Sequence, residues 1–335
     1  MKVLEIATDA PPYKGGISRL VSVLTEGLCK RGVHVDVKVP KHRFGEFKLS
    51  AISLKNYDDY DVVHVHGPTP FLSDILLLTN GCPMVYTHHA EIRWLSENIS
   101  QLYTRFHRFL ASTKAQVIIV HSQEYAHLFK AANVEVVHPP VTMLGPKNFR
   151  PEERVEQPFT VIYVGQFRAF KGINVIIDAA AFLKDVNFIL VGEGMLKPNF
   201  KRLVNRLNLG NVVFEDKVDD NALQKLYENS HVVCLPSLNT TEAYGLVLTE
   251  GALHGCIPVA SNLMGVRENL ELLGGFSFTK GSSEELVSII RKLKSKPKMW
   301  LSLSVQTYGR AIKYIEKYGA DHYVQKHMEL LQSVM

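Results

Sequence analysis

The sequence of 335 residues has few cysteines, and they lie far apart. Only four occur, at positions 29, 82, 234 and 256, and no pair has the C-x2-C spacing of a zinc or redox site. Each lies in or beside an apolar stretch, which favours buried thiols in a reducing cytosol over disulfides. The sequence therefore predicts a cytoplasmic protein whose fold depends on neither crosslinks nor a structural metal.

Long apolar runs and blocks of like charge are also missing. No stretch approaches 18 consecutive apolar residues, so we expect no segment to span a bilayer. The first residues, MKVLEIATDAPP, read as a strand that is too short and too polar at its end for a secretory signal. The 38 basic residues slightly exceed the 33 acidic ones, which suits anionic phosphates or an anionic membrane surface. Without a basic block, nucleic acid is not an expected partner.

Apolar strand-like runs alternate with amphipathic helical patterns along the whole chain. A proline- and charge-rich stretch at 139–158 interrupts them and is the expected linker. Repeated strand–helix units predict parallel sheets with helices on both faces. We therefore expect an α/β chain of two Rossmann-like domains, 1–150 and 151–317, facing each other across a cleft. The helical end, from about 318 to 335, is expected to pack back on the first domain.

The expected strands are bounded by turn-forming residues and are rich in Val and Ile. In the first half they cover 2–7, 34–39, 61–66, 84–88, 116–121 and 135–138, and in the second half 160–164, 187–191, 212–214, 231–235 and 257–260.

The segment 241–251, TEAYGLVLTEG, places Glu242 and Glu250 eight positions apart around a tight turn. It comes after an apolar run that reads as a strand, and residues 245–255 read as the next helix. The unpaired N–H groups at the start of such a helix form an anion site. Gly245 lets a phosphate approach the backbone closely. Because carboxylates accept hydrogen bonds from hydroxyl groups, the segment predicts a site for a phosphorylated sugar.

These features together resemble glycosyltransferase family 4, which has the GT-B fold and retaining chemistry. The segment 241–251 is similar to the E-x7-E motif of that family, and VASNLMGVREN at 259–269 is similar to the loop and helix that come after this motif. YVGQFRAFKG resembles the strand-end loop that carries basic residues, and LVGEG and the pair Gly15-Gly16 complete the pattern. The resemblance covers essentially the whole chain in the family's order.

The resemblance implies transfer of a hexose from a UDP- or GDP-linked sugar to a hydroxyl of a saccharide or lipid-linked saccharide. It implies a front-face mechanism that needs no metal and no cofactor beyond the donor. The catalytic set is Glu242, which holds the sugar hydroxyls, Lys171, which neutralises the diphosphate, and His89, which contacts the sugar from the first domain beside His88. The expected donor-binding residues are Gly16, Gln166, Arg168, Glu193, Val218, Tyr244, Gly245, Leu246, Val247 and Glu250.

One position departs from the family pattern, which has arginine where this chain has Gln166. Glutamine keeps hydrogen-bond donors but loses the charge and the bidentate fork. Phosphate neutralisation is then weaker, or it shifts onto Lys171 and the helix start, with Arg168 as a candidate substitute.

Three alternatives remain open at this point. A sugar-nucleotide epimerase on the same fold converts the donor without an acceptor, and a phosphorylase uses free phosphate. A non-catalytic nucleotide-sugar-binding subunit shows no turnover with any acceptor. The glutamine at 166 keeps the last alternative open, whereas Lys171 and both glutamates argue against it.

Two further patterns suggest a metal without completing a site. His64 and His66 share a face of one strand, but no third ligand with suitable spacing is visible. The string Asp59-Tyr60-Asp61 matches a D-x-D metal motif, yet it lies in a charged turn before a buried strand. We therefore expect no metal site, and we interpret both histidines as structural or cleft-lining.

The stretch 93–114 combines an apolar stripe with basic and aromatic residues, and it holds a single acidic residue. We expect the stripe to pack on the sheet, as a helix of this fold normally does. The basic flank is suited to peripheral contact with an anionic membrane. The stripe consists of Leu95, Ile99, Leu102, Phe106 and Phe109, and the flank of Arg93, Arg105 and Arg108.

Overall fold

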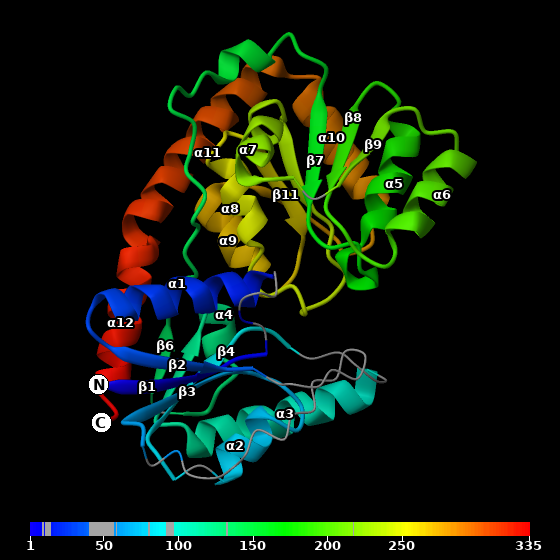
Figure 1. Cartoon of the computed structure of the whole chain (residues 1–335). Helices are drawn as coiled ribbons and strands as arrows, with labels where there is room; N and C mark the ends of the chain where they lie inside the picture. The colour runs from blue at the N-terminus through cyan, green and yellow to red at the C-terminus, as the bar shows by residue number, and fades with distance from the viewer. Residues whose placement is uncertain are drawn as a thin grey trace. The chain divides into compact units, whose positions relative to one another are not determined.

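The computed structural model describes residues 1–8, 10, 15–39, 57, 59–79, 81–91, 97–131, 133–216 and 218–335. The chain divides into two compact units, each with a six-stranded parallel sheet (Figure 1). Within the described ranges, none of the helices combines the length and the apolar character needed to cross a bilayer. Unit 1 comprises Met1–Pro140 with Lys317–Met335, and unit 2 comprises Val141–Glu316.

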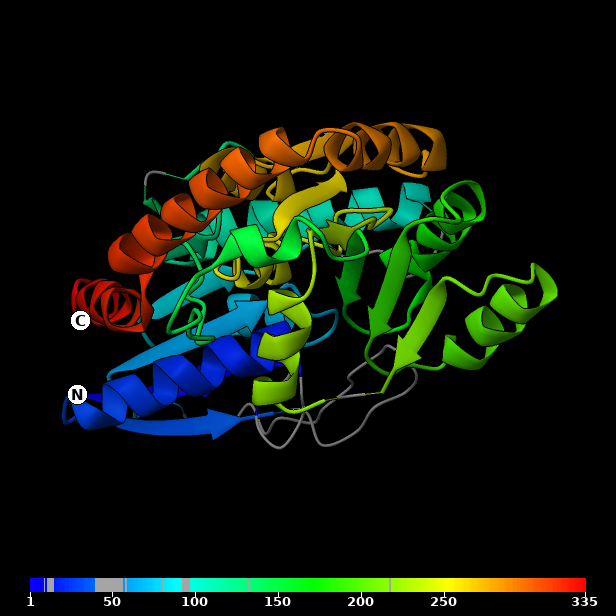
Figure 2. The same ribbon diagram turned by 90° about the horizontal axis from the view of Figure 1, so that it is seen from above.

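The sheet of unit 1 has the order β2-β1-β3-β4-β5-β6. Its helices α1 and α12 pack side by side, and Val324 on α12 leaves no room for a Cβ atom at Gly27 (Figures 1 and 2). The strands are β1 Lys2–Ile6, β2 His34–Lys38, β3 Val62–Gly67, β4 Met84–His88, β5 Val117–Val120 and β6 Val134–Val136. The helices are α1 Gly16–Lys30, α2 Ser73–Thr79, α3 Glu97–Lys114, α4 Gln123–Ala126 and α12 Ala320–Gln332.

The sheet of unit 2 has the order β12-β11-β10-β7-β8-β9. Successive side chains of β7 enter different apolar clusters, Val161 and Tyr163 in one and Ile162 in the other, because a strand alternates its faces. The strands are β7 Thr160–Val164, β8 Asn187–Val191, β9 Val212–Glu215, β10 Val232–Leu235, β11 Ile257–Ser261 and β12 Phe276–Phe278.

Helices cover unit 2, and polar side chains start two of them. Asp219 accepts a hydrogen bond from the backbone N–H of Ala222 at 2.8 Å, which caps α7. Ser282 caps α10 in the same way. The helices are η1 Pro151–Arg154, η2 Ala169–Lys171, α5 Ile173–Phe182, α6 Lys197–Arg206, α7 Asp220–Glu228, α8 Leu246–Ala252, α9 Val266–Leu273, α10 Ser283–Lys294 and α11 Pro297–Tyr318.

The predicted α/β class with parallel sheets is confirmed, and several boundaries differ in detail. The stretch expected as a linker is partly buried, because Val141 and Met143 pack in the core of unit 2. The helical pattern near the C-terminus breaks at Gly319, whose extended backbone caps α12. The helix expected over 245–255 ends at Ala252. Strand β12 has only three residues and carries no readable alternation.

Helix α3 turns its apolar stripe outward, so the prediction that the stripe packs on the sheet is wrong. Leu102 and Phe109 are 70% and 63% exposed. The buried face instead mixes Ser100, Thr104 and His107 with Leu110 and Ala111, and His107 lies 2.6 Å from the hydroxyl of Ser73 on α2. The face of α3 that contacts α2 is therefore the buried one. Leu95 of the stripe and Arg93 of the basic flank lie outside the described residues.

Candidate active site

Loops at the carboxyl ends of β7, β8 and β10 lie together at one edge of the sheet in unit 2. Backbone hydrogen bonds join them. The N–H of Phe167 donates to the carbonyl of Glu193 at 2.8 Å, and the N–H of Leu238 donates to the carbonyl of Phe170 at 2.7 Å. Parallel strands place their carboxyl ends at the same edge, where open α/β sheets bind ligands.

The candidate residues Lys171 and Glu242 meet directly. The Nζ atom of Lys171 lies 2.5 Å from Oε2 of Glu242, and the hydroxyl of Ser237 donates to the same oxygen at 3.2 Å. Both charged side chains are mostly buried, at 18% and 12% exposure. Gly172 next to the lysine has φ +65°, and the carbonyl of Pro236 leaves no room there for a Cβ atom. The backbone thus holds the ion pair at the sheet edge.

The start of α8 is held by its carbonyl groups and not by its N–H groups. Asn269 donates from Nδ2 to the carbonyls of Tyr244 and Gly245, at 3.2 and 3.1 Å. Gly245 has φ +78°, and a Cβ atom there would lie 2.6 Å from Leu235. Among the described residues, no side chain caps this N-terminus. The first N–H groups of a helix without such a cap are candidate donors for an anion.

The second glutamate of the motif lies deeper than the first. Glu250 is 4% exposed, and its Oε2 accepts a hydrogen bond from the hydroxyl of Tyr227 at 3.4 Å. The neighbouring candidates Leu246, Val247 and Val218 pack together against one apolar cluster of unit 2. This carboxylate is thus oriented by its surroundings and not by solvent.

The other donor-side candidates are exposed on the joined loops. Gln166, Arg168 and Glu193 are exposed, and the carbonyl of Gln166 accepts a hydrogen bond from Tyr163 at 2.9 Å. Their side chains are free to meet a ligand, and their backbones are held in place.

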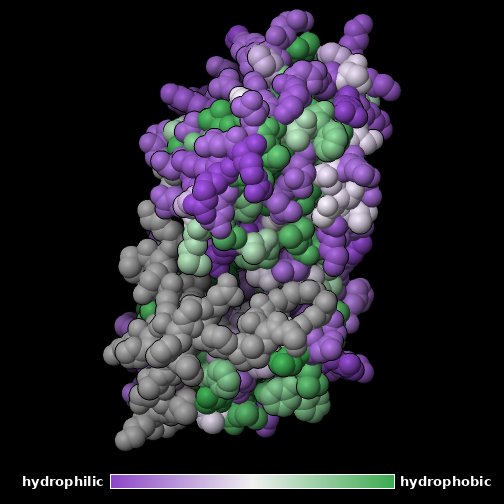
Figure 3. All heavy atoms as spheres, turned by 90° about the vertical axis from the view of Figure 1, so that its right-hand side faces the viewer, coloured by the Kyte–Doolittle hydropathy of each residue, from purple (hydrophilic) through white to green (hydrophobic). Residues whose placement is uncertain are grey.

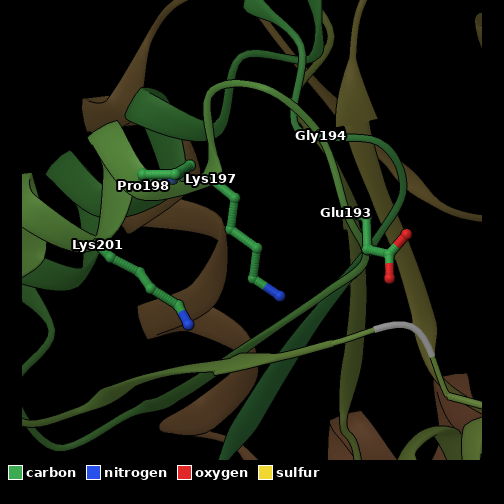
Figure 4. Close-up of a pocket in the computed structure, with 5 residues that line it drawn as sticks. All are labelled: Glu193, Gly194, Lys197, Pro198 and Lys201. Atoms are coloured by element: carbon green, nitrogen blue, oxygen red, sulfur yellow. The ribbon is translucent and has the colours of Figure 1, made fainter.

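A pocket of 360 Å³ lies between Glu193 and the start of α6. Figure 4 shows Lys197 and Lys201 extending in the same direction from α6. The Lys197 ammonium donates to the carbonyls of Gly192 and Glu215 and to the carboxylate of Asp216, at 2.6 to 2.8 Å. Its three hydrogens are therefore used within the protein, so Lys197 ties β8 to β9 and offers no donor to a ligand.

Unit 1 contributes Gly16, His88 and His89 to the candidate set. Gly16 is exposed as the first residue of α1, and no heavy atom lies near its missing side chain. His88 is buried, and burial lowers its pKa well below the ordinary value. His89 is 6% exposed, and its ring contacts His66 through Nε2 at 2.8 Å and His121 through Nδ1 at 3.0 Å.

The buried carboxylate of Glu5 was missed in the sequence, and it completes a cluster with His64 and His66. The carboxylate oxygen of Glu5 and the ring nitrogens of both histidines, which are atoms that could bind a metal, lie within 4.8 Å of one another. The Oε2 atom of Glu5 lies 2.9 Å from His64 Nδ1 and 2.7 Å from His66 Nε2. These are hydrogen-bond separations, shorter than the distance of about 3.3 Å between two ligands of a tetrahedral zinc ion.

Charge and burial act against each other on this carboxylate. Burial would raise the pKa of Glu5, but His64 and His66 lower it more, so it lies well below its ordinary value. The sequence signal was hidden because Glu5 and His64 are 59 positions apart, on the neighbouring strands β1 and β3.

Three residues that support the candidate site in unit 2 were also missed. Ser237 lies just after the end of β10, Tyr227 lies near the end of α7, and Asn269 belongs to α9. Only Asn269 lay in a segment that the family resemblance included, and its role requires the fold, because it holds a turn that lies 24 residues earlier.

Solved structures with similar backbones identify the fold. Anabaena Alr3699/HepE in complex with UDP matches with a TM-score of 0.76 and 21% identity, over 99% of this chain and all of that chain. Sucrose-phosphate synthase (tll1590) from Thermosynechococcus elongatus matches with a TM-score of 0.79 and 18% identity, over 99% and 98%. Identities at this level show the fold alone, and that fold is GT-B.

Two family models then match consecutive parts of the chain, Glycosyltransferase Family 4 over residues 39–143 and Glycosyl transferases group 1 over 146–311. The chain belongs to glycosyltransferase family 4, which confirms the resemblance of its motifs. O-antigen chain mannosyltransferase C of Escherichia coli is 26% identical, over 100% of this chain and 99% of that relative. D-rhamnosyltransferase WbpZ of Pseudomonas aeruginosa is 27% identical, over 61% of this chain and 55% of that relative.

Proposed function

We propose that this glycosyltransferase moves a hexose from a UDP- or GDP-linked donor to a hydroxyl of a saccharide or lipid-linked saccharide, with retention at the anomeric carbon. The observation that carries the proposal is the Lys171–Glu242 pair beside the uncapped start of α8. One cation and uncapped N–H groups suit a diphosphate, and a carboxylate suits sugar hydroxyls. The names of the mannosyl- and rhamnosyltransferase relatives and of the UDP-bound structure support the same chemistry.

Leaving-group stabilisation is the main task of the site. As the bond from the anomeric carbon to the diphosphate breaks, negative charge grows on the phosphate oxygens. Lys171 and the N–H groups of Gly245, Leu246 and Val247 face that charge. We assign Gly16 the same role from unit 1. These groups supply the positive charge in a mechanism that we propose to be independent of metal.

The two glutamates and the leaving phosphate complete the mechanism. Glu242 accepts hydrogen bonds from sugar hydroxyls, and Glu250 does so from the donor ribose. The acceptor oxygen attacks on the face that the diphosphate leaves, and its proton passes to a phosphate oxygen. Lys171 and Glu242 are paired in the free protein, so the phosphate must share or replace that contact. Donor binding thereby orients both side chains at once.

Ligand binding tests the donor side. A bound donor raises the unfolding temperature by mass action, so UDP-glucose, GDP-mannose and the free diphosphates should separate in a thermal-shift panel. No shift with any nucleotide sugar at millimolar concentration would contradict the proposal.

Turnover assays then separate the remaining alternatives. A transferase releases nucleoside diphosphate quickly only when an acceptor is present, and the product keeps the donor's anomeric configuration by NMR. Conversion of the donor alone indicates an epimerase, and dependence on free phosphate indicates a phosphorylase. Binding without turnover across a panel of saccharide and lipid-linked acceptors indicates a non-catalytic subunit.

We further propose that unit 1 contacts an anionic membrane through α3, which suits a lipid-linked acceptor. Large apolar side chains are exposed along this helix, and Arg105 is exposed beside them. Apolar side chains gather at the lower end of the face in Figure 3, at the level of α2 and α3. The exposed apolar residues are Ile99, Leu102, Phe106 and Phe109 on α3, with Phe71 and Leu78 at α2.

Liposome co-sedimentation at low and high salt tests this surface. The pair Leu102→Ser and Phe109→Ser should abolish binding to anionic vesicles, because apolar insertion and charge act together. Phe182→Ser is a matched control, since Phe182 is equally exposed, at 65%, but lies on unit 2. Equal binding by the pair and the control would contradict membrane contact through α3.

A further inference from the structure

A chain of hydrogen bonds crosses the buried core of unit 1. It starts at the carboxylate of Glu5, whose Oε2 lies 2.7 Å from His66 Nε2. His66 Nδ1 lies 2.8 Å from His89 Nε2, and His89 Nδ1 lies 3.0 Å from His121 Nε2. The chain ends where His121 Nδ1 lies 2.9 Å from the carbonyl of Val137. The carboxylate and all three rings are buried.

The number of protons in this chain is set by its two ends. A carboxylate and a carbonyl only accept hydrogen bonds, and each of the four contacts needs one hydrogen. Three neutral imidazoles carry one N–H each, which makes three. With neutral rings, one contact would place two acceptors against each other in a closed core, which is costly. The chain is complete only with a fourth proton.

The charge of Glu5 requires the same proton. Its side chain is fully buried, and among the described residues its polar partners are His64 and His66, without a lysine or arginine. His64 Nε2 lies 2.7 Å from the hydroxyl of Thr87, so a neutral His64 satisfies both of its contacts. A buried carboxylate without a positive partner is strongly unfavourable. One extra proton in the chain neutralises it and completes every hydrogen bond.

We propose that Glu5, His66 and His121 are positioning residues for His89, joined in a chain that keeps this fourth proton at neutral pH. With the charge on His66, every ring donates from Nδ1 toward Val137, and His89 is held as its Nδ1–H tautomer. Both nitrogens of His89 are then occupied, so it offers a ligand an oriented ring and not a free nitrogen. This inference rests on the proposed glycosyl transfer only for the role of His89 near the sugar, which the family resemblance implies.

Position favours His66 as the carrier of the charge, because its Nε2 lies 2.7 Å from the Glu5 carboxylate. Burial lowers the pKa of His89 well below its ordinary value and that of His121 to about 4. Burial and His64 lower the pKa of His66 below its ordinary value, and Glu5 acts against them by raising it. Only His66 lies against the carboxylate among the three rings. The other titratable groups that act on the chain are His64 on β3, His88 on β4, His138 after β6, and Tyr323 and His327 on α12.

Substitution of Glu5 by glutamine tests the role of the fourth proton separately from the role of the hydrogen bonds. In Glu5→Gln the amide N–H donates to a neutral His66, and the amide oxygen accepts from His64. All contacts are then made without the titrating proton. Glu5→Leu instead removes the partner of His66 and breaks the chain. Glu5→Gln therefore loses only the proton, whereas Glu5→Leu loses the hydrogen bonds of the chain as well.

Nitrogen NMR of the unliganded protein reads the proton directly and needs no turnover. At pH 7, protein labelled with ¹⁵N-histidine should show one buried ring protonated on both nitrogens. That signal should be lost in Glu5→Gln, while the melting temperature stays within a few degrees of the unmodified protein. His107→Gln removes a buried histidine outside the chain and should leave the signal in place. Only neutral rings in the unmodified protein would overturn the proposal.

The pH dependence of kcat/KM tests the positioning role of the chain. In the unmodified enzyme, log kcat/KM should fall with a slope of about −1 once the chain loses its proton at alkaline pH. Glu5→Gln should lack that limb, whereas Glu5→Leu should lower kcat/KM roughly 100-fold at neutral pH, as misplaced catalytic groups do. An alkaline limb unchanged in Glu5→Gln would contradict the role of the chain.

Three outcomes separate this proposal from its alternatives. Metal bound stoichiometrically to the purified protein and removed by EDTA would overturn it, because a metal at Glu5 requires an unprotonated His66 nitrogen. Absence of transferase activity together with the doubly protonated ring would contradict only the proposed function. The NMR signal without any change in the pH profile would reduce the chain to a structural element and so overturn its positioning role.

Discussion

The two units are built on the same kind of sheet and differ in what they bury. Unit 2 surrounds β7 and β10 with apolar side chains and places its charged candidates at the strand ends. Unit 1 buries histidines from β3 and β4 together with a carboxylate from β1. A parallel sheet therefore tolerates buried polar side chains when their polar atoms are hydrogen-bonded. Because the buried side chains include histidines, the free energy of unfolding must then depend on pH.

Acidification should have the largest effect and should act on unit 1 first. Burial lowers the pKa of His121 and His138 to about 4 and that of His107 to about 3, and it lowers that of His88 and His327 well below the ordinary 6.5. The unfolded chain binds protons below pH 6.5, whereas these folded rings stay neutral. Each ring then lowers the free energy of unfolding by about 1.4 kcal/mol for every pH unit that the pH falls.

The loss should begin near pH 6.5 and be complete only below about pH 4 for His121 and His138. Unit 2 holds fewer such rings, chiefly His231 and His254. Hydrogen exchange measured by mass spectrometry between pH 7.5 and 4.5 should therefore show peptides of unit 1 opening first. Earlier opening of unit 2 would contradict the prediction that unit 1 is the more sensitive of the two to acid.

Removal of the ion pair should abolish most of the activity while both units stay folded. Lys171→Met and Glu242→Gln should each lower kcat about 100- to 1000-fold, because each removes a group that we propose to face the reacting sugar diphosphate. The two side chains are in contact, so the double variant should be only slightly slower than either single variant. Turnover close to that of the unmodified enzyme in either single variant would refute the assigned roles.

A matched control accompanies this prediction. Lys292→Met removes an exposed lysine of α10 in the same unit, away from the pocket beside Glu193. Its kcat should change less than twofold. Circular dichroism and melting temperature should be the same for the control and for the active-site variants.

A methyl group at the turn before α8 should have a smaller effect that is confined to unit 2. Gly245→Ala forces a side chain into the left-handed region at φ +78° and toward Leu235. We expect a loss of about 1–2 kcal/mol in unfolding free energy and weaker binding of the nucleoside diphosphate. Gly210→Ala is the control, since open space surrounds Gly210. Equal denaturant midpoints for both variants would contradict the strained turn.

The smallest expected effect is the addition of the missing arginine. Gln166 is exposed on the loop after β7, so Gln166→Arg adds a solvated charge near the proposed diphosphate. Donor affinity should rise by about fivefold at most, or ~1 kcal/mol, and the gain should fall with added salt. Gln157→Arg adds the same charge at another exposed position of unit 2 and should leave affinity unchanged. A salt-independent gain would point to another cause.

Local patterns predicted the parts of the site that lie close together in sequence. The segment 241–251 carries its own turn residue, and the structure places Gly245 in the left-handed conformation at the start of α8. The pairing of Lys171 with Glu242 was beyond reach, because 71 residues separate them and the contact depends on how two strand-end loops meet. The proposed roles of these residues stay predictions.

The spacing of apolar residues correctly predicted helix α3, but the prediction that its apolar face is buried was wrong. Hydrophobic spacing assumes that the apolar side is buried, but α3 buries His107 against Ser73 and exposes Phe109. The partner of the buried face lies on α2, and spacing within one helix holds no information about it. For the same reason, the pattern His64-x-His66 did not reveal Glu5 on the neighbouring strand.

The sequence by itself determined the alternation of strands and helices, the GT-B class and the family, because those features depend on neighbouring residues and short motifs. Only the tertiary structure decided which charged groups meet, which face of α3 is exposed and how the histidines of unit 1 are joined. Hydrogen bonds and ion pairs act over about 3 Å in space, and the chain brings such atoms together from any separation in sequence. The buried carboxylate of Glu5 is significant only in the folded protein.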